Sequence, residues 1–97
     1  MTTKQRAFLK SLAMKIDPIF QIGKSGLTPS LTKAIQEAID ARELIKVSIL
    51  QNCDIDAREL AATIGERTRS QVVQVIGRKI VLYKEGKEDK KVIKLPK

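Results

Sequence analysis

Apolar and polar residues follow two different periods along the chain, and these periods predict three helices and four strands. Apolar residues spaced by three and four positions predict helices over residues 3–16, 28–42 and 56–66. Strict alternation or short β-branched runs predict strands over residues 19–22, 44–50, 71–76 and 79–83. The predicted order is therefore α-β-α-β-α-β-β.

Several residues mark the expected ends of these elements. Thr3, Thr28 and Asp56 are expected to cap the three helices, because their side-chain oxygens accept hydrogen bonds from free backbone N–H groups. Gly65 is expected to end the third helix, since glycine is common just after a helix. Gly77-Arg78 separates the last two strands and predicts a type II′ hairpin turn.

The alternation of strands with helices predicts the fold class. Helical crossovers between strands favour parallel pairs, and the terminal hairpin adds an antiparallel pair. We expect a single compact α/β domain in which a mixed four-stranded sheet packs with helices.

Composition and charge narrow the class of partner. The 97 residues are 42% hydrophobic and 31% charged, as in folded globular domains, and the net charge is +8. Residues 1–33 carry a net charge of +5, residues 34–66 one of −4 and residues 67–97 one of +7. This excess predicts a polyanionic partner, with nucleic acid ahead of an anionic membrane. If the two basic ends meet in the fold, the acidic middle is expected to face away.

The shortage of catalytic and metal-binding residues argues against an enzyme. The chain has no histidine and one cysteine, which removes the commonest general base and the usual zinc ligands. The tight carboxylate pair Asp54 and Asp56 is explained more simply by helix capping. Cys53 is expected to be a buried or half-buried apolar residue. No apolar run reaches the ~18 residues of a membrane span, so we expect a cytoplasmic protein. We also expect a monomer with no cofactor and no metal.

The loop Gly23-Lys24-Ser25-Gly26 is the clearest candidate site. It lies between a predicted strand and a predicted helix N-terminus, where a phosphate is favoured, and its glycines leave no Cβ in the way of a ligand. A nucleotide-binding P-loop would require glycine where the chain has Pro18. The G-x-x-G loop of KH domains, which clamps a nucleic-acid backbone, fits better. A plain β–α turn is the alternative without function.

The aromatic residues indicate how RNA would be recognised. Only Phe8, Phe20 and Tyr83 are present, and both phenylalanines are expected in the core. A sheet that stacks bases needs exposed aromatic residues. Contacts are therefore expected mainly to phosphate and sugar, with strong salt dependence.

Several segments together resemble the CRM (chloroplast RNA splicing and ribosome maturation) domain, and particularly its stand-alone bacterial YhbY-like members. They are Lys4-Gln5-Arg6, Gln21-Ile22-Gly23-Lys24-Ser25-Gly26-Leu27-Thr28, Ala41-Arg42-Glu43-Leu44-Ile45-Lys46-Val47, Gln74-Val75-Ile76-Gly77-Arg78-Lys79 and Val81-Leu82-Tyr83. The resemblance implies a domain over residues 1–84 with a fold similar to the C-terminal domain of bacterial translation initiation factor 3. It also implies binding of ribosomal RNA in precursors of the large (50S) ribosomal subunit, as an assembly factor.

The same resemblance places RNA binding at Gly23, Lys24, Ser25 and Gly26. Charge placement adds further candidates for RNA contact, namely Lys4, Arg6, Arg67, Arg69 and Arg78. Residues 85–97 form a basic tail, in which Val92, Ile93 and Leu95 are a candidate edge strand.

Two other functions stay open at this point. A protein–protein adaptor that docks on ribosomal proteins or an assembly enzyme could use the acidic residues Glu37, Asp40, Glu43, Glu59 and Glu66. A DNA-binding protein is less favoured, because no helix-turn-helix pattern or dimer heptad is visible.

Overall fold

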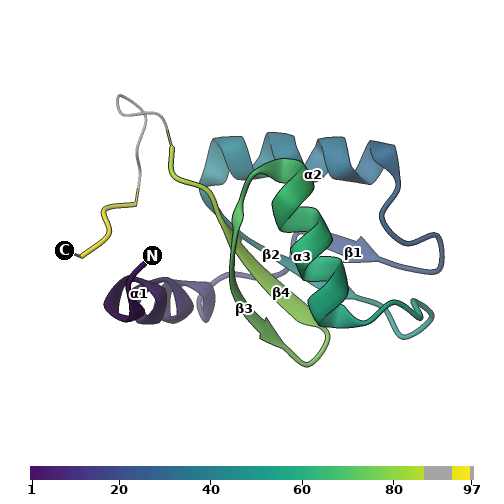
Figure 1. Cartoon of the computed structure of the whole chain (residues 1–97), viewed down its shortest axis with the longest axis horizontal. Helices are drawn as coiled ribbons and strands as arrows, with labels where there is room; N and C mark the ends of the chain where they lie inside the picture. Colours follow the sequence, from purple (N-terminus) through teal and green to yellow (C-terminus); the bar gives the residue numbers. More distant parts are fainter. Residues whose placement is uncertain (87–92, 97) are drawn as a thin grey trace.

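The fold is a mixed four-stranded sheet with helices on both faces, and the predicted order of elements is confirmed (Figure 1). The computed structural model describes residues 1–86 and 93–96. Its elements are α1 (Thr3–Ala13), β1 (Phe20–Ile22), α2 (Pro29–Arg42), β2 (Leu44–Ile49), α3 (Ala57–Thr68), β3 (Gln71–Ile76) and β4 (Lys79–Tyr83). Within these described ranges, no helix has the length and apolar character needed to cross a bilayer.

The sheet has the strand order β1-β2-β4-β3 and contains both kinds of pairing. β1 and β2 are parallel, with Phe20 opposite Val47, and α2 forms the crossover between them. β4 is antiparallel to both β2 and β3. Gly77 has a φ of +56° whereas Arg78 does not have a positive φ, which fits the predicted type II′ turn.

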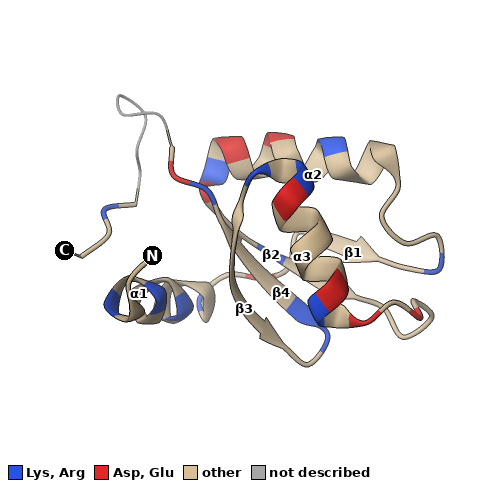
Figure 2. Ribbon diagram, viewed as in Figure 1, with Lys and Arg blue, Asp and Glu red and all other residues tan. Residues whose placement is uncertain are grey.

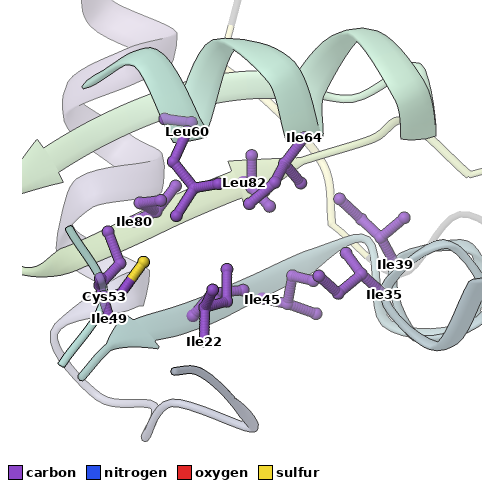
Figure 3. Close-up of a cluster of buried hydrophobic side chains, with 12 residues drawn as sticks. Ile22, Ile35, Ile39, Ile45, Ile49, Cys53, Leu60, Ile64, Ile80 and Leu82 are labelled. Carbon is purple, nitrogen blue, oxygen red and sulfur yellow. The ribbon is translucent and has the colours of Figure 1, made fainter. Parts of the chain in front are cut away.

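Helices α2 and α3 cover one face of the sheet and bury the larger core. Alternation on β2 and β4 directs Ile45, Val47 and Leu82 to this face, where they meet Ile39 of α2 and Ile64 of α3 (Figure 3). Cys53 is buried at the edge of the same cluster, as predicted. This core fixes the ends of β1 and β2 and therefore the loops that follow them.

Helix α1 covers the other face of the sheet and buries a second, smaller core. Leu9 and Ala13, four residues apart on one side of α1, pack against Leu44, Val81 and Tyr83. The basic helix α1 and the helices α2 and α3, which carry Glu37, Asp40, Glu59 and Glu66, therefore lie on opposite sides of the sheet (Figure 2).

The structure corrects three details of the predicted first helix. Thr2, not Thr3, is its N-cap, because the Thr2 hydroxyl accepts from the Gln5 backbone N–H while the Gln5 side chain accepts from the Thr2 N–H, both at 3.0 Å. The helix ends at Ala13 rather than residue 16. Phe8 is 37% exposed and not a core residue, because it lies beside the buried stripe of Leu9 and Ala13.

The third helix runs past Gly65 instead of ending there. It continues to Thr68, and the left-handed C-cap is Arg69, with a φ of +56°. Gly65 is buried, and a Cβ at this position would lie 3.1 Å from the Ser70 carbonyl oxygen and 3.3 Å from Val72 Cγ2. The glycine therefore serves the close approach of α3 to β3 rather than helix termination.

The end of the chain returns to the second core. Ile93 and Leu95 are partly buried against it, the Ile93 N–H donates to Glu43 Oε1 at 3.2 Å, and Gln5 Nε2 donates to the Pro96 carbonyl at 3.1 Å. Residues 93–96 lie in no strand. The remainder of the predicted edge strand, Val92, lies outside the described residues.

This docking gives a stability prediction. Replacing both Ile93 and Leu95 by alanine should lower the free energy of unfolding by about 2 kcal/mol, because two partly buried side chains are truncated. Urea unfolding followed by circular dichroism measures the change. The exposed neighbour Lys94, replaced by alanine, is the control and should change stability by less than about 0.5 kcal/mol. Equal stability of both variants would show that the tail does not dock.

Candidate nucleic-acid interface

The loop from Gly23 to Gly26 is a tight turn that presents two side chains to solvent. The Gly26 N–H donates to the Gly23 carbonyl at 2.9 Å, and Gly26 has a φ of +67°. Lys24 and Ser25 at the tip are exposed, whereas Gly26 is buried. The turn therefore exposes one positive charge, on Lys24, and one hydroxyl, on Ser25.

Helix α2 begins directly after this loop. The Thr28 side chain accepts from the Leu31 N–H at 3.1 Å and Pro29 occupies the first turn, so the predicted cap is confirmed. Lys24 thus precedes the helix N-cap by four residues, and a lysine and a helix N-terminus each favour an anion.

The loop that follows β2 supports the glycine loop from one side. The Leu50 N–H donates to the Ile22 carbonyl at 2.8 Å, immediately before Gly23. A Cβ at Gly23 would lie 3.4 Å from Leu50 Cδ1, and one at Gly26 would lie 3.2 Å from Ile55 Cδ1. Both glycines thus turn their missing side chains toward the protein. At Gly26 the tight contact and the positive φ both favour glycine, whereas at Gly23 a Cβ would make only ordinary contacts, and clearance for a ligand stays a prediction.

Arg78 lies at the same end of the molecule and holds the supporting loop in place. Its Nε donates to the Ile49 carbonyl at 3.1 Å, and its Nη2 donates to the carbonyls of Leu50 at 2.5 Å and Cys53 at 3.0 Å. These carbonyls belong to the segment on which Gly23 packs. Arg78 therefore has a structural task, and its contact with RNA stays a prediction.

The two candidates on α1 lie on the opposite face of the sheet from α2. Lys4 is exposed. Arg6 is half-buried, and its Nη1 donates to the carbonyls of Val72 and Val73 at 2.9 and 2.8 Å. The β3–β4 register shifts between Val72 and Gln74, so Arg6 satisfies carbonyls at a β-bulge.

The structure does not bring Arg67 and Arg69 near the glycine loop. Both are exposed at the C-terminal end of α3. The N-cap of that helix, Asp56, follows Ile55, which packs beside Gly26. A helix of 12 residues is about 18 Å long, so the two arginines lie at the opposite end of α3 from the glycine loop.

Three lysines outside the predicted RNA contacts form a basic surface on the α1 side of the sheet. Lys46 of β2 and Lys79 of β4 lie on the sheet face that α1 covers only in part, and Lys10 of α1 lines the same groove. In the sequence, Lys46 and Ser48 alternate with apolar neighbours, which predicts that both face away from the larger core. Only the strand register, with Ser48 opposite Lys79, shows that these residues share a face with β4.

The acidic residues named for the adaptor hypothesis do not form one exposed acidic surface. Glu43 is 1% exposed, and Asp40 forms an ion pair of 2.6 Å with Lys84. Glu37, Glu59 and Glu66 are exposed on α2 and α3. Lys33, Arg58 and Arg67 are interspersed with them on these helices, so the surface there is of mixed charge.

Comparisons with known proteins agree with this picture. The family model of the CRS1 / YhbY (CRM) domain matches residues 1–84. The chain is 53% identical over 92 residues to the "Probable RNA-binding protein YqeI" of Bacillus subtilis, covering 95% of this chain and 96% of that protein. It is 37% identical over 98 residues to an "RNA-binding protein" of Haemophilus influenzae, covering 100% and 96%.

A solved structure matches over the whole domain. The solution structure of the Staphylococcus aureus protein SAV1595, described as a candidate RNA-binding protein, aligns with a TM-score of 0.82 and 54% identity over 99% of each chain. The fold, the spacing of the motifs and these matches lead to one conclusion. The chain belongs to the CRS1 / YhbY (CRM) domain family.

Proposed function

We propose that this protein binds structured ribosomal RNA through a surface centred on the Gly23–Gly26 loop. The observation that carries the proposal is the exposed Lys24–Ser25 tip of a hydrogen-bonded turn that precedes the N-terminus of α2. The names of the relatives agree with RNA as the ligand. The protein would act without catalysis, as an assembly factor on precursors of the large ribosomal subunit.

The geometry favours contacts to the RNA backbone. Tyr83 is 2% exposed and Phe20 packs against the larger core, so neither offers a ring for base stacking. Phe8 is partly exposed but lies on α1, away from the loop. Lys24 and Ser25 can instead pair with phosphate and sugar oxygens, which gives binding that depends on shape and salt more than on sequence.

Reversing the charge of Lys24 tests the site. Lys24→Glu should weaken binding to a large-subunit ribosomal RNA fragment by about tenfold or more, because a phosphate contact becomes a repulsion. Fluorescence anisotropy at several salt concentrations measures the affinity. The exposed Lys33 on α2, changed to glutamate, carries the same net charge and should bind within about threefold of the original protein. Loss of affinity in both variants to the same degree would contradict a specific role of the loop.

The assembly role needs a separate experiment. In sedimented cell extracts the protein should migrate with free large-subunit precursors rather than with translating ribosomes. Ribonuclease treatment should release it from these particles. A protein that keeps its partner after the RNA is digested is an adaptor, and the proposal would then be wrong.

A further inference from the structure

Helix α1 leaves half of its sheet face uncovered. Leu9 and Ala13 cover Leu44 and Tyr83, which lie at the end of the sheet farther from the Gly77-Arg78 turn. The remaining half of this face reaches the turn and the carboxyl ends of β1 and β2, where the Gly23–Gly26 loop begins. An open surface thus adjoins the proposed RNA site.

The strand register places one row of side chains across this open half. Gln21 is opposite Ser48, Ser48 is opposite Lys79, and Lys79 is opposite Ile76. Residues opposite one another in neighbouring strands point to the same face. The row therefore runs from Gln21, two residues before the glycine loop, to the outer edge of β3.

A groove runs between this row and the end of α1. Its volume is about 310 Å³, and its apolar lining includes Ala13 and Val81. Two further apolar residues at the groove are unusually exposed, Met14 at 84% and Ile76 at 58%. With Ala13 and Val81 they form one contiguous apolar patch, and exposed patches of this kind can mark a binding surface.

Three lysines surround the apolar groove. Lys10 comes from α1, Lys46 from β2 and Lys79 from β4, and in the described part of the chain no carboxylate lines the groove with them. Three positive charges without a negative one favour a polyanion as occupant over an apolar peptide or a second copy of this basic chain.

We propose that this groove binds a single-stranded segment of RNA that continues from the glycine loop, an inference that rests on the proposed function. The lysines contact successive phosphates, and Met14 and Ile76 contact the faces of unstacked bases. Only single-stranded segments expose base faces in this way. Methionine suits such contacts, because its flexible, polarisable side chain adapts to different rings.

Removing two groove charges tests the proposal. The double variant Lys46→Gln/Lys79→Gln should bind a single-stranded RNA of eight uridines about tenfold more weakly. It should also show a salt dependence reduced by about 1.4 in the slope of log K against log salt, at about 0.7 per lost single-strand contact. A matched double variant, Lys33→Gln/Lys94→Gln, has the same net charge and exposed positions outside the groove. It should bind within about threefold of the original protein, and equal weakening of the two doubles would overturn the inference.

A second measurement on the unchanged protein does not depend on how Lys46 variants fold. In methyl NMR spectra, the signals of Met14, Ile76 and Val81 should shift when the uridine octamer is added and not when a blunt RNA duplex is added. If RNA shifts loop signals alone, the groove inference fails and the proposed function stands. If no RNA binds, both fail. Groove signals that shift with protein concentration without RNA would show that a second copy occupies the groove, which also overturns the inference.

Discussion

Replacing Arg78 by alanine is expected to lower the free energy of unfolding by about 3 kcal/mol. The guanidinium donates to the carbonyls of Ile49, Leu50 and Cys53, and each such charged hydrogen bond contributes roughly 1.5 kcal/mol or more when its loss leaves a partner unsatisfied. Arg78 is exposed, so competition with water keeps the total below the simple sum. Urea unfolding of the variant measures the change.

Two further variants separate this structural task from a contact with RNA. Arg78→Lys keeps the charge but cannot reach three carbonyls with one ammonium group, so it should lose most of the same stability. Arg67→Ala removes an exposed arginine on α3 and should change stability by less than about 0.5 kcal/mol. If lysine at position 78 restores full stability, the carbonyl network is not what Arg78 contributes.

The consequence for RNA binding follows from the position of these carbonyls. They belong to the segment against which Gly23 packs, so loss of Arg78 should loosen the glycine loop. Arg78→Lys should then weaken RNA binding even though the net charge is unchanged. An unaltered affinity would show that the loop keeps its shape without this support.

Local patterns in the sequence predicted the elements well, because the forces that set them act over a few residues. Two apolar, β-branched-rich runs predicted β3 and β4 at the observed residues, and Gly77 has the positive φ of the predicted turn. The cap at Thr28 was also predicted, since it depends on a hydrogen bond three residues along the chain. The prediction that Gly65 ends the third helix is wrong, because glycine is needed there for the close approach of β3.

The arrangement of layers and the roles of individual arginines could not be predicted in the same way. A crossover between parallel strands has a preferred hand, which places α2, but α1 precedes the first strand and has no such constraint. The bonds of Arg6 to Val72 and of Arg78 to Leu50 join residues distant in the chain. In the sequence these arginines are recognisable only as positive charges, and positive charge alone predicts contact with RNA.

The two glycines of the loop give the second large expected effect, because the structure assigns them different tasks. Gly26→Val should lower the free energy of unfolding by about 3 kcal/mol. A β-branched residue at a φ of +67° is strongly disfavoured, and the Cβ would also press on Ile55 Cδ1 at 3.2 Å. RNA binding should fall together with stability, because the turn that presents Lys24 would be distorted.

Gly23→Ala is expected to have almost no effect on either property. Gly23 does not have a positive φ, and the added Cβ would lie in ordinary contact with Leu50 and Asn52, at 3.4 and 3.5 Å. Stability should change by less than about 0.5 kcal/mol, and RNA affinity by less than about threefold. A Gly23→Ala variant that folds normally but binds RNA tenfold more weakly would show that RNA reaches the backbone on the side facing Asn52. In that case the motif's first glycine, and not only its lysine, would belong to the binding surface.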